Sequence, residues 1–169
     1  MDYRRRRLDE RLAAHLKLAL LVLAATLIQT TLLPAVLRAQ FNLVLIATTC
    51  WTMIGGPGKG AAVGFYGGLF LDLLAHSALG THALALLAVA GMSAVVVERF
   101  PAENWLLTLM LVGIGTPLYH LIVLGLGGGV DSWLAWLVVV IPPAMVVNLV
   151  SALPEFLVIR WWHERQDIY

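Results

Sequence analysis

Apolar residues occur along this chain in long segments that are separated by short polar or glycine-rich turns. A helix needs about 20 residues to cross the roughly 30 Å of hydrocarbon in a bilayer. The second and third segments are short, so each would have to be tilted, partly re-entrant or extended into its loop. The pattern predicts an all-α membrane protein, a six-transmembrane-helix bundle. We expect the spans at 16–37, 41–54, 61–75, 79–97, 105–126 and 133–159.

The composition supports a membrane protein and excludes several other classes. Of the 169 residues, 60% are hydrophobic and 12% are charged, whereas a soluble domain has about 25% charged residues. The net charge of +1 argues against disorder and against nucleic-acid binding. No linker is long enough to separate two domains, so we expect one polytopic membrane domain over residues 1–169. Cys50 lies in an apolar segment and is expected to be a small core residue.

The basic residues predict the orientation, because cytoplasmic loops are enriched in lysine and arginine. With six spans and with the N- and C-termini cytoplasmic, ten of the eleven basic residues lie inside and only Arg38 lies outside. The first segment is longer than the roughly 7–15 apolar residues of a secretory signal, so we expect it to be a retained span. Tryptophans mark the expected ends of the last two spans, and Pro142 and Pro143 should kink the sixth.

The third segment carries small and polar residues at every fourth position, which places them on one helix face. Glycines in this arrangement allow close approach of another helix. Two interpretations are open: packing against a neighbouring span, or docking of a separate membrane protein. For Asp72 we expect a structural role, such as hydrogen bonding to the start of the next span, because no second carboxylate suggests proton coupling. The residues are Gly60, Gly64, Gly68, Asp72 and His76.

The predicted topology gathers a polar cluster toward the outer leaflet. Its members lack the close spacing of metal ligands, so a solvated rim or a shallow cavity is the expected structure. No cofactor is expected. The glycine-rich turn around Lys59 lacks the spacing of a phosphate loop, and no nucleophile motif or pair of carboxylates is present. We therefore expect a protein that is not an enzyme. The outer polar cluster consists of Asp72, His76, His82, His120 and Asp131.

Two stretches, Gly64-Phe-Tyr-Gly-Gly-Leu-Phe-Leu-Asp-Leu-Leu74 and Ser77-Ala-Leu-Gly-Thr-His-Ala-Leu84, resemble the MreD family of rod-shape-determining membrane proteins. The specific resemblance covers roughly residues 41–90. It implies a non-enzymatic, multi-pass protein of the bacterial inner membrane that helps to maintain rod shape. The implied partners are an MreC-like single-span protein, membrane lipid and, through the elongation complex, MreB, RodA and a class B penicillin-binding protein.

The MreD family is also similar in fold to the S-components of vitamin uptake transporters. This similarity gives an alternative function, a substrate-binding S-component with an outward-facing cavity. Asp72, His76, His82 and His120 would line that cavity. Against this alternative, the outer loops are short and lack the aromatic and polar groups expected to enclose a vitamin.

Overall fold

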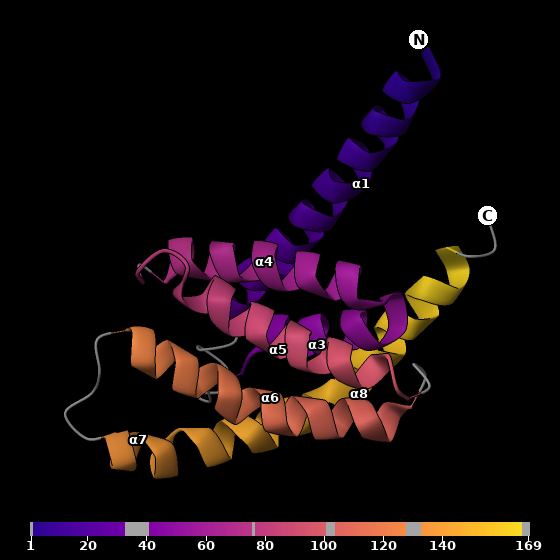
Figure 1. Cartoon of the computed structure of the whole chain (residues 1–169). Coiled ribbons are helices and arrows are strands. Elements are labelled where there is room, and N and C mark those ends of the chain that lie inside the picture. Colours follow the sequence, from indigo (N-terminus) through magenta and orange to yellow (C-terminus); the bar gives the residue numbers. More distant parts are fainter. Residues whose placement is uncertain (1, 33–40, 76, 101–103, 128–132, 167–169) are drawn as a thin grey trace.

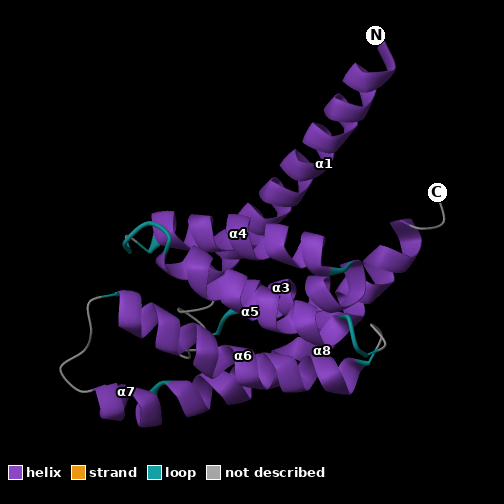
Figure 2. Cartoon of the chain, in the orientation of Figure 1, coloured by secondary structure: helices purple, strands orange, loops and turns teal. Residues whose placement is uncertain are grey.

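The computed structural model describes residues 2–32, 41–75, 77–100, 104–127 and 133–166, and within these ranges all regular structure is helical (Figure 2). Short turns join α3 to α4 and α7 to α8, as expected for helices that pack beside their neighbours in sequence. The elements are α1 (Asp2–Leu27), the π-helical turn η1 (Ile28–Leu32), α3 (Leu43–Gly55), α4 (Pro57–Leu74), α5 (Thr81–Val97), α6 (Trp105–Leu126), α7 (Trp133–Val139) and α8 (Ile141–Gln166).

Helix α3 lies at the centre of the bundle and contacts α1, α4, α5, α6 and α8. Its 13 residues extend about 20 Å at 1.5 Å per residue, less than the thickness of a bilayer core. Eight of these residues are buried, among them Leu45, Ile46 and Met53, which are fully inaccessible. Because its neighbours surround it, this short helix meets protein rather than solvent or lipid along most of its surface.

The other helices form pairs around α3 (Figure 1). Helix α4 packs against α5, α5 against α6, and α6 against α8. Helix α1 is different, because its N-terminal part extends away from the bundle. Its C-terminal part packs against α4 and α3, where Val22 and Thr26 are buried. The N-terminal end of α1 and the C-terminal end of α8 lie toward the same side of the bundle.

The helix boundaries can be compared with the expected spans. Helix α6 covers 105–126 as predicted, whereas α4 begins four residues before the expected 61 and includes Lys59. The last segment is interrupted at Val140, which separates α7 from α8 directly before Pro142 and Pro143. This confirms the predicted interruption, since two prolines remove two backbone donors. Residues 33–37 of the first expected span lie outside the described residues.

Among the residues that the structure describes, three stretches are long and apolar enough to cross a membrane: Leu12–Thr31, Trp105–Leu126 and Leu137–Arg165. Helices α3 and α5 are apolar but shorter. Helix α4 has 18 residues and carries Lys59, Asp72 and five glycines, which lower its mean hydropathy. Large apolar side chains also cover the outward faces; for example, 59% of Ile114 and 71% of Val150 are exposed. These observations support the character of a membrane protein.

Candidate functional site

The glycine face of α4 packs against helices of the same chain. Gly60, Gly64 and Gly68 are buried. A Cβ atom on Gly64 would lie 3.1 Å from Thr48 Cγ2 of α3 and 3.3 Å from the Leu86 carbonyl oxygen of α5. A Cβ atom on Gly60 would overlap Thr52 of α3. The close approach expected of this glycine pattern therefore occurs between α4, α3 and α5.

Gly68 makes the tightest approach to α5. A Cβ atom at this position would overlap the backbone of Ala83, so no side chain fits without separating the two helices. Gly67, which is outside the four-residue pattern, lies as close to α3, because a Cβ atom there would overlap the side chain of Val44. Of the two interpretations of the glycine pattern, the structure describes packing within the chain. Because α3 and α5 cover these glycines, they offer no surface to a separate membrane protein.

Asp72 lies in the last turns of α4 and is 1% exposed. Its Oδ1 accepts hydrogen bonds from Ser77 Oγ at 3.0 Å and from the His82 backbone N–H at 2.8 Å. Its Oδ2 accepts from the backbone N–H groups of Gly80 at 2.9 Å and Ala83 at 3.4 Å. The first backbone N–H groups of a helix have no partner within that helix. Asp72 thus supplies the acceptors that the start of α5 needs.

The turn before α5 explains why the N–H groups at the start of this helix depend on the carboxylate of Asp72. The N-cap residue of α5 is Gly80, whose φ of 97° lies in the left-handed region that favours glycine. Glycine has no side-chain oxygen, and this helix start shows no side-chain cap of its own. The carboxylate of Asp72 reaches across the turn and replaces the missing cap. This is the type of hydrogen bond considered for Asp72 in the sequence analysis.

The expected outer polar cluster is brought together in part. His82 Nδ1 lies 2.7 Å from the hydroxyl oxygen of Tyr119, and the two rings are stacked with 5.7 Å between centroids. The ring of His120 is buried and meets the Tyr119 ring edge-on at 5.3 Å. Asp72 joins this group through the backbone of His82. His76 and Asp131 lie outside the described residues.

A second group of polar side chains joins four elements at the same depth of the fold. Asn42 precedes α3, and its Oδ1 accepts from the Leu45 N–H at 2.9 Å. Gln29 of η1 donates to the same Oδ1 at 3.4 Å and accepts from the Val44 N–H at 3.0 Å. Both contacts tie the end of the first helix to the start of α3.

Asn148 of α8 completes this group. Its Oδ1 accepts from the Asn42 backbone N–H at 2.9 Å, and its Nδ2 donates to Thr116 Oγ1 of α6 at 3.1 Å. Asn148 is fully buried. Hydrogen bonds between side chains of packed helices stabilise helix association in a membrane. Gln29, Asn42 and Asn148 were not singled out from the sequence. Gln29 and Asn148 could have been, because each is an isolated amide within an apolar segment.

The chemistry of this polar end is that of a structural network. Both oxygens of Asp72 accept hydrogen bonds from backbone and hydroxyl groups, and the amides of Gln29, Asn42 and Asn148 bond to one another or to helix ends. Within the described residues, no three His, Cys, Asp or Glu side chains gather as a metal ion would require. These hydrogen bonds join η1, α3, α4, α5, α6 and α8 through polar side chains of the interior.

Together, the fold and this network define a helical protein with the apolar exterior of a membrane protein and a hydrogen-bonded polar interior at one end. A comparison with known protein families, curated proteins and solved structures finds no match to this chain.

Proposed function

We propose that this chain is a non-enzymatic membrane scaffold of the bacterial cell-elongation machinery, as its resemblance to the MreD family implies. One observation carries the proposal: the resembling segment folds into the α4–α5 hairpin, and its distinctive residues each have a packing or capping contact there. Gly64 and Gly68 set the distance between helices, Asp72 caps α5, and Gly80 forms the turn. A motif with these contacts builds a rigid hairpin rather than a reactive centre.

The proposal places the chain in the bacterial inner membrane with six spans and both termini in the cytoplasm. In its support, Lys59 Nζ at the start of α4 lies 3.5 Å from His163 Nε2 near the end of α8. Lys17 of α1 lines the same cavity as Lys59 and Trp162 of α8. Basic groups from three helices thus gather at one end of the bundle, as the enrichment of cytoplasmic surfaces in lysine and arginine requires.

Cysteine labelling in intact cells tests this topology. In a Cys50→Ser background, Ser77→Cys should react with a membrane-impermeant thiol reagent, because residue 77 lies in the turn between α4 and α5. Gly58→Cys and Glu164→Cys should react only after the cells are permeabilised. Labelling of Glu164→Cys in intact cells would contradict cytoplasmic termini and an even number of spans.

The proposed direct partner is an MreC-like single-span protein, which would dock by its transmembrane helix on an outward apolar face. The outward faces of α6 and α8 supply such surfaces, with Met110 and Ile114 on α6 and Val146 and Val150 on α8 exposed. Co-expression and purification in detergent tests this. We expect recovery of the MreC-like protein at least tenfold above that of an unrelated single-span protein with the same tag. Equal recovery would contradict the scaffold function.

The alternative function as a vitamin-binding S-component requires the polar cluster to line a cavity. His82, His120 and Asp72 instead contact other groups of the interior, and none of them lines the cavity of about 960 Å³ found between α1 and α4. The contacts therefore favour the scaffold. A vitamin that stays bound through purification would reverse this preference.

A further inference from the structure

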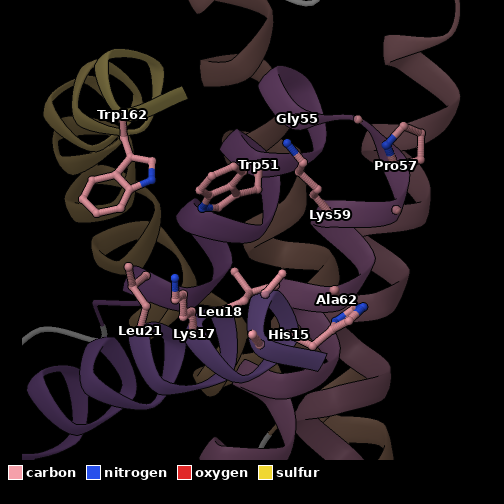
Figure 3. Close-up of a pocket in the computed structure, with 14 residues that line it drawn as sticks. His15, Lys17, Leu18, Leu21, Trp51, Gly55, Pro57, Lys59, Ala62 and Trp162 are labelled. Atoms are coloured by element: carbon pink, nitrogen blue, oxygen red, sulfur yellow. The ribbon is translucent and has the colours of Figure 1, made fainter. Parts of the chain in front are cut away.

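A cavity of about 960 Å³ lies where the N-terminal part of α1 diverges from the bundle (Figure 3). One wall is α1, with Leu18 and Leu21. The opposite wall is the α3–α4 junction, and Trp162 of α8 closes one side. Binding sites for small molecules commonly have volumes of about 300–1,000 Å³, so this cavity is large enough for a ligand of substantial size.

The charge of the cavity has one sign. Lys17, Lys59 and His15 line it, and among the described residues that form its wall there is no carboxylate. Lys59 Nζ also lies 5.8 Å from the centre of the Trp51 ring and 3.5 Å from His163 Nε2. In the described part of the chain, neither lysine forms an ion pair with an acidic side chain. Two ammonium groups therefore face a cavity whose described wall carries no carboxylate.

The remaining lining is apolar and aromatic. Alanines and leucines of α1 form one wall, and the indole rings of Trp51 and Trp162 lie across from them (Figure 3). Tryptophan prefers the headgroup layer of a membrane, where an apolar ring and a polar N–H are both accommodated. A cationic edge beside an apolar wall matches a ligand that has an anionic head and a hydrocarbon body.

The position of the cavity along the helices agrees with such a ligand. Lys17 lies near the start of the membrane-crossing stretch Leu12–Thr31, and Trp162 lies near the end of Leu137–Arg165. Both therefore lie at the level where the hydrocarbon meets the headgroups. A lysine at this depth can extend its ammonium group to the interface while its stem contacts apolar surface. Basic pockets between transmembrane helices bind anionic lipid headgroups in this way.

We propose that this cavity binds one anionic phospholipid. Lys17 and Lys59 hold the headgroup phosphate, and the acyl chains lie along Leu18 and Leu21 of α1 between this helix and α4. The first turn of α4, which begins at Pro57 and lines the cavity, contributes the partial positive charge of a helix N-terminus. The lipid would fill the space between α1 and the bundle and so fix the direction of α1.

Native mass spectrometry of the full-length chain in detergent tests this proposal. The probes are phosphatidylglycerol and phosphatidylcholine with identical acyl chains, added separately. We expect one phosphatidylglycerol to be retained, with at least tenfold preference over phosphatidylcholine. Lys17→Gln with Lys59→Gln should weaken phosphatidylglycerol binding by about tenfold or more, because each cation near the headgroups attracts an anionic lipid. The matched control, Arg99→Gln with Arg165→Gln, removes the same charge outside the cavity and should change binding less than twofold.

Two further arms make each outcome decisive. Inorganic phosphate at millimolar concentration should not displace the lipid; displacement would show a phosphate site and overturn the assignment to a lipid. Phosphatidylglycerol with brominated acyl chains should quench tryptophan fluorescence, and Trp51→Phe with Trp162→Phe should remove most of that quenching. Equal retention of both lipids, or equal loss in the two charge variants, would also overturn the proposal. Melting curves without lipid show whether each variant is folded.

Discussion

The polar side chains at the two ends of this bundle differ in burial and in hydrogen bonding. At one end, Asp72, Asn42 and Asn148 are at most 4% exposed, and they accept or donate hydrogen bonds to helix starts and to one another. At the other end, Lys17 and Lys59 are exposed and face a cavity of about 960 Å³, and no described carboxylate pairs with them. We call the first end, whose polar groups are paired within the protein, the closed end. The second end, whose lysines face the cavity, is the open end.

The difference follows from what each group costs in a membrane-like environment. A buried polar group without a partner is expensive, and the buried side chains of Asp72, Asn42 and Asn148 are each hydrogen-bonded. A lysine at the edge of the hydrocarbon keeps its ammonium group in a polar layer and does not need a protein partner. Asp72, Asn42 and Asn148 therefore stabilise the fold at one end, whereas Lys17 and Lys59 keep their ammonium groups exposed at the other.

The largest expected effect is at the helix contact beside the closed end. Gly68→Leu should prevent the close approach of α4 and α5, because even a Cβ atom would overlap the Ala83 backbone. Overpacking a core costs about 1–3 kcal/mol or more, and with backbone as the obstacle we expect loss of the folded state. Gly91→Leu is the matched control, since a Cβ on Gly91 meets nothing within 4 Å. Melting in detergent measures both, and similar melting of the two variants would contradict the packing described for α4.

The next effect concerns the cap of α5. Asp72→Leu leaves the N–H groups of Gly80, His82 and Ala83 without an acceptor, and we expect a loss of about 3 kcal/mol in the free energy of unfolding. Asp72→Asn keeps one oxygen but turns an NH₂ group toward N–H donors, so it should cost about 1–2 kcal/mol. Denaturant titration in detergent gives both values. A cost for Asp72→Asn equal to that of Asp72→Leu would show that the charge, rather than the number of acceptors, matters.

A smaller loss is expected in the second polar group. Asn148→Leu removes the acceptor of the Asn42 backbone N–H and the donor to Thr116 Oγ1. One buried donor left without a partner costs about 1–3 kcal/mol. Val146→Leu, two residues before Asn148 on α8 at a position that is 62% exposed, is the control and should melt as the unmodified protein does. An unchanged melting temperature for Asn148→Leu would mean that this network does not stabilise the bundle.

The smallest effect is expected at the open end. Glu164→Gln breaks an i,i+4 ion pair in which Arg160 Nε lies 2.8 Å from Glu164 Oε1, with side chains 40% and 60% exposed. Exposed pairs of this type contribute about 0.3–0.5 kcal/mol, so the melting temperature should change little and less still at high salt. A loss comparable to that of Asp72→Asn would remove the contrast between the two ends.

Local features of the fold were well predicted from the sequence. The bounds of α6, the interruption before Pro142 and the close helix approach at Gly64 and Gly68 each follow from hydropathy, from the missing N–H of proline or from the absence of a side chain. The polar groups were predicted less completely. The structure brings His82 and His120 together through Tyr119, which contacts both and was not noticed in the sequence. Its aromatic ring is unremarkable in an apolar segment until its neighbours are known.

The sequence alone determined the helical class and the approximate segments, because those depend on the period and length of apolar runs near each residue. The central place of α3, the pairing of Asn42 with Asn148, 106 residues away, and the cavity between α1 and α4 were decided by the tertiary structure. These features depend on which helices become neighbours, and an apolar run carries little information about its partners because leucine and valine pack against any apolar surface. The sequence indicates which helix packs against which, and how closely, only where a glycine permits close approach or where a buried polar group needs a hydrogen bond.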